Sequence, residues 1–500
     1  MNVLTRLPKF LAAIVLLWPA VAGAADQSVW PLTPYQVRVF VALASEAPLT
    51  PRLEADLLAD LSARIEAVVG PPWNVTMSAP PPALRRDKPK LQRSARPKRD
   101  EFADLRRDML YGLDTLQADK IPIPSPEPDK ILFVAVTVVP GGLKVMARDF
   151  DVHTRTLSYL VTRPVWQIGS LCDASLDALL SAFAPLARVD RIERDGKDSI
   201  AVLRVKAAGL PIRDPSLKIL QAGDVFRPLV CYKNRDNKYL GTSRSRWSLC
   251  VVEKIAPEEV RCRVHSGVRG AEMPTRGKGR AESLALRVQS PGGSTMVLLQ
   301  SRVPPKKPLA GCDVYAYPPD KKDAVALVGQ TDRRGLLLVP SLKGSPARVL
   351  LVQNGNALLA KLPIVPGLER QVTAEIPNDD QRLGAEGFIT GLQEELFDIV
   401  ARQKIFVAMI KSRVDAKQFD KAAELIDKLR GLPTAQQLNL QLVSEQERLA
   451  TSDPSIQKKI DMLMNDTRQL IDKWLDPQII EDLERDLREA KTAAEKSAAN

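Results

Sequence analysis

The chain has 500 residues, a formal net charge of +12 and an apolar content of 45%. This length predicts three to four domains, and the apolar content is ordinary for globular proteins, so each domain can bury a core. The sequence contains two histidines, His153 and His265. That number excludes a three-histidine metal site and a His-Glu-x-x-His zinc motif. The positive charge favours acidic partners, such as anionic lipid headgroups, acidic glycans or acidic proteins.

The first residues have the three parts of a secretory signal peptide. Arg6 and Lys9 are positive, residues 10–18 are apolar, and small residues precede an expected cleavage between Ala24 and Ala25. The apolar run is short for a membrane span, and no later run approaches the ~18 apolar residues that a transmembrane helix needs. The sequence therefore predicts a periplasmic or secreted protein, for which nucleic acid is not an expected partner. An uncleaved N-terminal membrane anchor is the alternative.

Residues 29–210 predict an α+β domain built on an antiparallel or mixed sheet. The expected helices repeat apolar residues at spacings of three and four, whereas the expected strands alternate. Pro140-Gly141-Gly142 joins two strands into a hairpin, and Asp173 is a suitable N-cap for the last helix. We expect strands at 35–44, 73–77, 131–139, 143–149, 156–165 and 200–206, and helices at 52–69, 101–116 and 174–189.

A basic, proline-rich stretch interrupts this domain at residues 80–99. It has few apolar residues to bury, so we expect a surface loop. Two interpretations remain open for it: a solvated loop, or a tract with weak affinity for acidic envelope surfaces. Its basic residues are Arg85, Arg86, Lys88, Lys90, Arg93, Arg96, Lys98 and Arg99.

Residues 223–302 lose the helical period and predict a small β-barrel or β-sandwich. Short apolar runs alternate here with turn residues, such as Ser290-Pro291-Gly292-Gly293. The expected strands lie at 226–233, 247–254, 259–264, 283–288 and 295–300.

Residues 303–377 predict a second β module. Gly311 opens an alternating strand, and Thr331-Asp332-Arg333-Arg334-Gly335 precedes the apolar run 336–340. The aspartate can bond its own backbone in such a turn, and the glycine supplies a positive φ. This pattern resembles the transthyretin-like, carboxypeptidase-regulatory type of β-sandwich over residues 309–377. The resemblance implies a non-catalytic accessory module of an extracellular protein.

Residues 384–490 predict a helical region. Apolar residues recur at alternating spacings of three and four in 389–410 and 456–474, as in a coiled coil. Residues 415–430, which include Ala422 and Ala423, resemble half of a tetratricopeptide repeat. A stable array needs about three repeats, so a helical hairpin, bundle or coiled coil is favoured, and it can mediate self-association or hold a protein partner. Residues 491–500 are expected to form a frayed, disordered tail.

The five cysteines allow two interpretations. An oxidising compartment permits disulfides, and a pair among Cys231, Cys250 and Cys262 is reasonable because they share one β-rich stretch. Buried free thiols are the alternative for these three and for Cys172 and Cys312. The odd number leaves at least one thiol unpaired within the chain.

No catalytic, metal-binding or cofactor-binding residue is predicted. A general-base role for His153 beside Cys172 has no supporting protease signature, and no Gly-x-Ser-x-Gly motif is present. Residues 270–278 lack the spacing of a phosphate-binding loop. The sequence as a whole favours an exported binding or assembly protein without a cofactor, whose β modules are spacers or docking units. The alternative is an exported hydrolase with its site in the N-terminal α+β domain.

Overall fold

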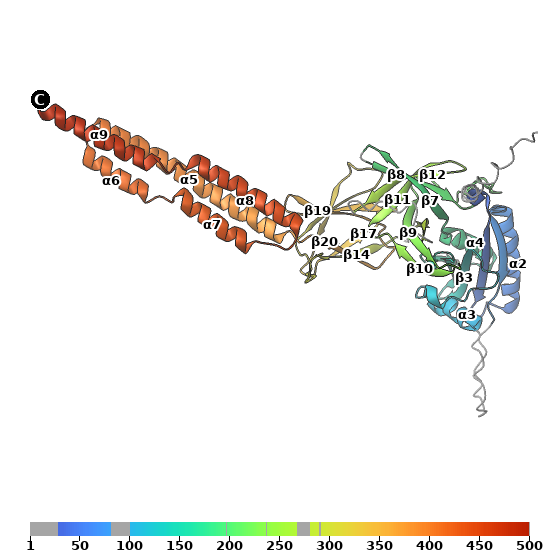
Figure 1. Ribbon diagram of the computed structural model, residues 1–500. Coiled ribbons are helices and arrows are strands. Elements are labelled where there is room, and N and C mark those ends of the chain that lie inside the picture. Colours follow the sequence, from blue (N-terminus) through green and yellow to red (C-terminus); the bar gives the residue numbers. More distant parts are fainter. Residues whose placement is uncertain are drawn as a thin grey trace, which may run out of the picture.

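The computed structural model describes residues 29–81, 101–196, 198–236, 238–267, 281–289 and 292–499. The predicted signal peptide, most of the basic loop 80–99 and the segment 270–278 lie outside these ranges. The expected multi-domain α+β architecture is confirmed: an N-terminal domain is followed by a barrel, a sandwich and a long helical rod (Figure 1). None of the helices in the described ranges combines the length and apolar character that crossing a bilayer requires.

The N-terminal domain contains a mixed sheet in the order β2-β1-β3-β4, and β5 and β6 both pair with β4. The central strand β1 is parallel to both β2 and β3. From β1 the chain crosses to β2 on one side of β1, and from β2 it crosses back over β1 to β3 on the other side. Right-handed crossovers therefore place α2 and α3 on opposite faces of the sheet. The elements are β1 (Tyr35–Leu43), α2 (Pro51–Val68), β2 (Trp73–Ser78), α3 (Glu101–Gly112), β3 (Lys130–Val139), β4 (Gly142–Asp151), β5 (Thr156–Leu157), β6 (Val161–Val165) and α4 (Leu171–Ala182).

The barrel closes through six strands in the order β9-β11-β12-β8-β7-β13, because β13 pairs with β9, and β10 adds a seventh strand beside β9. Two predictions for this part of the chain are wrong. The helix expected at 174–189 ends at Ala182, because Pro185 disfavours helical geometry at the residue before it. The strand expected at 200–206 exists, but it belongs to the barrel rather than to the N-terminal sheet. The strands are β7 (Leu186–Asp195), β8 (Asp198–Val205), β9 (Val225–Lys233), β10 (Tyr239–Arg244), β11 (Ser248–Ile255), β12 (Val260–Ser266) and β13 (Ala281–Val288).

Two further sheets pack face to face and form the sandwich, in the orders β17-β14-β20 and β16-β15-β18-β19. The strand expected at 295–300 lies here and not in the barrel, since Val297 and Leu299 are buried in the sandwich core. The predicted turn is present: Asp332 Oδ1 accepts from the backbone N–H groups of Arg334 and Leu336, and Gly335 has φ +72°. The strands are β14 (Ser294–Ser301), β15 (Asp313–Tyr317), β16 (Ala326–Gln330), β17 (Leu336–Pro340), β18 (Arg348–Asn354), β19 (Ala357–Ile364) and β20 (Gln371–Ile376).

The helical region forms a rod that projects from the sandwich (Figure 1). One continuous helix, α5, runs outward for 36 residues, which corresponds to about 54 Å. The chain returns through α6 and α7 and runs outward again through α8 and α9, so the rod is a three-helix bundle. Helix α9 continues to Ala499 through the segment expected to fray, because its alanine, lysine and glutamate residues are good helix formers. The helices are α5 (Asp380–Asp415), α6 (Phe419–Arg430), α7 (Ala435–Arg448), α8 (Pro454–Trp474) and α9 (Ile479–Ala499).

A buried arginine joins the rod to the sandwich. Arg382, in the first turn of α5, is 3% exposed. Its Nε lies 2.6 Å from Asp379 Oδ2, and its Nη2 donates to the carbonyl of Asn354 on β18 at 3.0 Å. Glu386, one turn along α5, also pairs with this guanidinium. These contacts fix the direction in which α5 leaves the last strands.

Replacing Arg382 with leucine is expected to loosen this joint. Asp379 would remain as an unpaired buried carboxylate, which costs about 3–5 kcal/mol locally. Small-angle X-ray scattering of the full chain should then report a wider range of rod orientations, while circular dichroism shows unchanged helix content. Arg448→Leu is the control, because that guanidinium is exposed on α7 and pairs with Glu445 of the same helix. A scattering curve identical to that of the wild type would contradict the assignment.

Candidate functional site at the junction of the N-terminal domain and the barrel

A lysine and two aspartates meet between the N-terminal domain and the barrel because of the register of one hairpin. The two-residue turn Pro140-Gly141 pairs the ends of β3 and β4, and Gly141 has φ +87°. That register places Lys130 directly opposite Asp151, and Asp149 is two residues along the same face of β4. Sequence reasoning missed this group. The three-residue turn expected at Pro140-Gly141-Gly142 would place Lys130 opposite Val152, whereas the observed turn has two residues and places it opposite Asp151.

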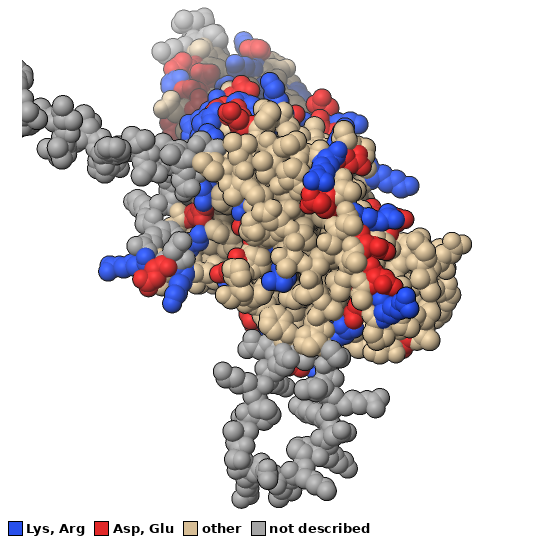
Figure 2. Space-filling model, turned by 90° about the vertical axis from the view of Figure 1, so that its right-hand side faces the viewer, with Lys and Arg blue, Asp and Glu red and all other residues tan. Residues whose placement is uncertain are grey.

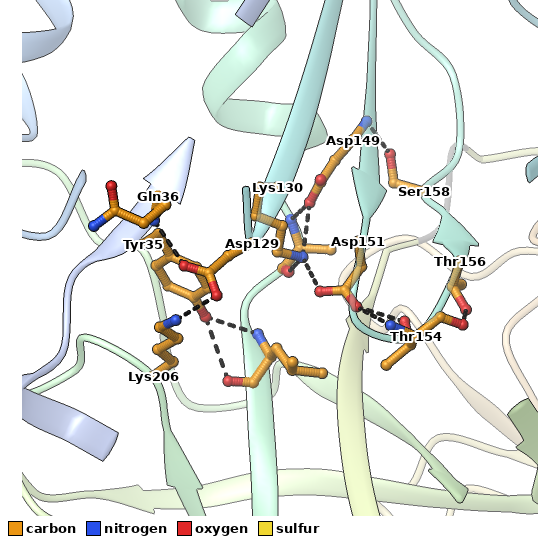
Figure 3. A network of polar contacts seen from close by, with 12 residues as sticks. Tyr35, Gln36, Asp129, Lys130, Asp149, Asp151, Thr154, Thr156, Ser158 and Lys206 are labelled. Carbon is orange, nitrogen blue, oxygen red and sulfur yellow. Dashed lines mark hydrogen bonds and ion pairs between the residues drawn. The ribbon is translucent and has the colours of Figure 1, made fainter. Parts of the chain in front are cut away.

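The Lys130 ammonium group is completely buried and lies close to three oxygen atoms (Figure 3). Its Nζ lies 3.1 Å from Asp149 Oδ2, 2.9 Å from Asp151 Oδ2 and 2.6 Å from the carbonyl oxygen of Ala184. The contacts with Asp149 and Ala184 are hydrogen bonds, whereas the contact with Asp151 is an ion pair without hydrogen-bond geometry. The backbone N–H of Ala184 in turn donates to Asp149 Oδ2 at 2.8 Å. The ion cluster therefore ties β3 and β4 to the segment that leads into the barrel.

A second set of contacts joins β1 to the barrel beside this cluster (Figure 3). The Tyr35 hydroxyl accepts from the backbone N–H of Leu186 at 2.9 Å and donates to the carbonyl of the same residue at 3.3 Å. Asp129 accepts from Lys206 Nζ at 2.5 Å and from the backbone N–H of Gln36 at 2.7 Å. The first residue of β7 is thus bonded to β1, and the residue after β8 is bonded to the residue before β3.

Burial and charge act in opposite directions on the two aspartates. Burial raises the pKa of Asp149 to about 6, against the attraction of Lys130. Burial alone would also raise the pKa of Asp151, but Lys130 outweighs it together with the bonds from Thr154 N and Oγ1, at 2.8 and 2.6 Å. The pKa of Asp151 is therefore below its ordinary value. Because all three charged side chains are shielded from solvent, this arrangement is suited to holding two domains together.

His153 takes part in a separate contact between the N-terminal domain and the barrel. Its Nε2 lies 2.8 Å from Glu282 Oε2 on β13, and Arg188 and Lys233 also pair with this carboxylate. Burial would raise the pKa of Glu282, but these partners outweigh it and hold the pKa well below the ordinary value. Cys172 lies in different surroundings, at the start of α4 near Arg64. The structure therefore does not bring His153 and Cys172 together.

All five cysteines are free thiols. The pairing considered for Cys231, Cys250 and Cys262 is thus absent, and the buried-thiol alternative describes them. Cys250 and Cys262 lie in the apolar core of the barrel, and burial raises the pKa of Cys250 to about 12. A thiol with such a pKa is a poor nucleophile at neutral pH.

His265 is buried where the barrel meets the sandwich. It lies on β12, which contacts β19, and it is 4% exposed. Burial lowers its pKa to about 4, and the nearby cations of Lys361, Lys322 and Arg263 act in the same direction. Within the described ranges its Nε2 has no hydrogen-bond partner. The imidazole is therefore neutral at physiological pH.

A charged cleft adjoins the buried cluster. A cavity of about 310 Å³ lies between the end of α4, β5 and the barrel. A second cavity of about 680 Å³ lies between β10, β11 and the loop before β20. The two cavities share Thr156, Arg227, Arg244 and Glu369 in their linings, so they adjoin one another. Together they are called the cleft, and residues of the N-terminal domain, the barrel and the sandwich line it. By contrast, the end face opposite the rod carries a broad area without charged side chains, bordered by charges of both signs (Figure 2).

No protein-family model and no curated protein matches the sequence. Among solved structures, the chain is similar to TolB from Acinetobacter baumannii, with 13% identity over 70% of this chain and 96% of that one, and a TM-score of 0.17. It is also similar to the Bacillus anthracis TIE protein, with 11% identity over 44% of this chain and 46% of that one, and a TM-score of 0.14. At these TM-scores neither similarity supports a conclusion about this chain.

Lys130→Met is expected to destabilise the N-terminal domain by about 3–5 kcal/mol, because it leaves buried carboxylates without a counter-charge. Adding Asp149→Asn should recover part of that loss, since it removes one of the uncompensated charges. Urea unfolding of the full chain, monitored by tryptophan fluorescence, measures both effects. Lys120→Met is the matched control because Lys120 is exposed. Equal unfolding midpoints for the two single variants would contradict a structural role for the cluster.

His265 predicts a loss of stability in acid. The folded-state pKa is about 4 and the ordinary value is 6.5, so between these limits the unfolded chain binds a proton that the folded chain does not. Stability therefore falls as the pH decreases through this window, by up to about 3 kcal/mol. Unfolding the wild type and His265→Gln at about pH 7 and about pH 4.5 isolates this contribution, since all other groups are common to both. Parallel losses in the two proteins would refute it.

Proposed function

We propose that this chain is an exported binding and assembly protein without catalytic activity, and that its helical rod associates with the rod of a second copy. The observation that carries the proposal is an apolar stripe on the exposed side of α5. Phe397, Ile405 and Met409 are 71%, 59% and 40% exposed, and the exposed Ala401 lies between them. A spacing of four residues places them on one face of the helix. Isolated exposed apolar residues are common, but a continuous stripe of this kind is typical of an interface.

The charges beside the stripe are complementary to a second copy of themselves. Toward the start of α5 the exposed flanking residues are acidic, at Glu394, Glu395 and Asp398. Toward its end they are basic, at Arg402, Lys404 and Lys411. In an antiparallel pair related by a two-fold axis, the acidic part of each helix faces the basic part of the other. Opposite charges at the rim then fix the register, and the apolar stripe provides the buried centre.

The other modules fit the same role. The barrel and the sandwich separate the N-terminal domain from the rod, so they are suited to act as spacers or docking units. Residues 309–377 are proposed to be a transthyretin-like module, which the bonded Asp332 turn and the two-sheet packing support. The ion cluster around Lys130 is shielded from solvent, which supports a structural rather than a catalytic use of these carboxylates.

Self-association is tested by replacing Ile405 with glutamate. A carboxylate at the centre of the stripe would be desolvated in the pair, so the dissociation constant of the full chain should rise at least about tenfold. Sedimentation velocity over a concentration series measures it. Leu440→Glu is the matched control, because Leu440 is 63% exposed on α7 and lies outside the stripe. A wild-type chain that remains monomeric at every concentration would overturn the proposal, as would equal effects of the two variants.

The non-catalytic part of the proposal has its own test. The purified full chain should show no turnover in a broad screen of peptide, ester and glycoside substrates. Turnover that a single acidic substitution in the N-terminal domain abolishes would replace the proposal with the hydrolase alternative.

A further inference from the structure

The cleft between the three β-containing units has a large excess of positive charge. Its lining includes six arginines and one carboxylate, that of Glu369. The arginines are Arg148, Arg155, Arg227, Arg244, Arg246 and Arg287. A concentration of like charges in a concave site is unfavourable for folding alone and increases the local concentration of anions. The cleft therefore has the electrostatic character of an anion-binding site.

Most of these arginines are held in place by protein groups. Arg227 pairs with Glu369 at 2.7 Å, Arg155 with Glu127 at 2.9 Å, and Arg148 donates to the carbonyl oxygens of Ser158 and Leu113. Arg287 is 7% exposed and donates to two backbone carbonyls, while its buried Nε has no partner among the described residues. These arginines are rigidly placed, as preorganised binding groups are.

Three of the six arginines have no carboxylate partner in the part of the chain that the structure describes: Arg148, Arg244 and Arg246. Arg148 is already bonded to backbone carbonyls, so the other two are the candidates for binding an anion. Arg244 is the last residue of β10 and Arg246 follows it, and both are exposed to solvent in the cleft. The surrounding protein atoms and the Arg227 cation lower the pKa of Arg244. The Arg244 side chain is thus accessible to water, although other residues of the cleft surround it. Both guanidinium groups are available to an incoming anion.

The larger cavity is also bordered by two edge strands. β10 pairs with β9 on one side, and β20 pairs with β14 on one side. Tyr239 and Thr242 of β10 and Gln371 and Thr373 of β20 line the cavity. An edge strand has unpaired backbone N–H and C=O groups, which an extended peptide can satisfy by adding as a further strand. A compact anion would use the arginines and leave these edges unused.

We propose that this cleft binds an extended acidic peptide segment, which pairs with an exposed strand edge and places its carboxylates against Arg244 and Arg246. The two cavities together span three structural units, so the segment would also join the N-terminal domain, the barrel and the sandwich. The hydroxyls of Ser243 in β10 and of Ser245 in the following turn add neutral donors along the same wall. This site is separate from the α5 stripe and does not depend on self-association.

The test measures binding of a fluorescein-labelled peptide to the full chain by fluorescence anisotropy. The peptide alternates glutamate and threonine and is about ten residues long. The double variant Arg244→Gln/Arg246→Gln is expected to weaken binding at least about tenfold, since charge-assisted contacts contribute strongly. Arg52→Gln/Arg107→Gln removes the same charge from exposed positions on α2 and α3 and should bind like the wild type. All four positions are exposed, so each variant should retain the fold, which circular dichroism verifies.

Two competitors separate the peptide from other anions. A peptide of alternating glutamate and proline has the same charge but lacks half of the backbone donors, and it should bind at least about fivefold more weakly. Inorganic pyrophosphate should compete poorly, because it cannot use the strand edges. The proposal is overturned if the glutamate–threonine peptide does not bind, if the two double variants bind it equally, or if the proline peptide matches it. Efficient displacement by pyrophosphate would assign the cleft to a compact anion instead.

Discussion

A fully buried ammonium group needs close acceptors of opposite charge or polarity, and Lys130 takes them from two aspartates of β4 and from the chain that follows α4. This requirement fixes several other parts of the structure. The helix before Ala184 has to end so that a backbone carbonyl is free to face β3, and the chain then enters the barrel directly at Leu186. The barrel is thereby held against the N-terminal sheet, and the arginine-lined cleft lies beside this fixed joint. Without the ion cluster the cleft would lose one of its walls.

Local sequence signals predicted the local structure well. The Asp332–Gly335 turn appears where expected, and the β3–β4 turn differs from the expected one only in that Gly142 belongs to β4. A positive φ and an aspartate that bonds its own backbone depend only on neighbouring residues. The helical period from residue 389 onward likewise predicted the bundle, since a repeated apolar face needs a partner of the same kind. These features do not depend on which distant strand lies beside them.

Sheet membership could not be predicted in the same way. The alternation in 200–206 and in 295–300 identifies strands, but the same pattern suits the N-terminal sheet, the barrel or the sandwich. The ion cluster could not be predicted either. Its register depends on whether the hairpin turn has two or three residues, and its burial depends on the barrel packing against it. The cleft was not predictable, because its arginines come from β4, β9, β10 and β13 and from turns between them. Their convergence is a property of the tertiary fold.

The bending stiffness of the rod is not uniform along its length. The second and third passes of the bundle are both interrupted at one level, at Gly431–Pro433 and at Leu475–Pro477. The two apolar cores of the rod meet there, near Val400 and Phe406 of α5. At this level α5 is the helix that continues without a break. The bending stiffness of the rod is therefore lower here, and a force applied to the side of the rod would bend it at this level. The rod should therefore behave as two stiff segments joined by a single-helix flexure, which lets its tip tilt without disturbing either core.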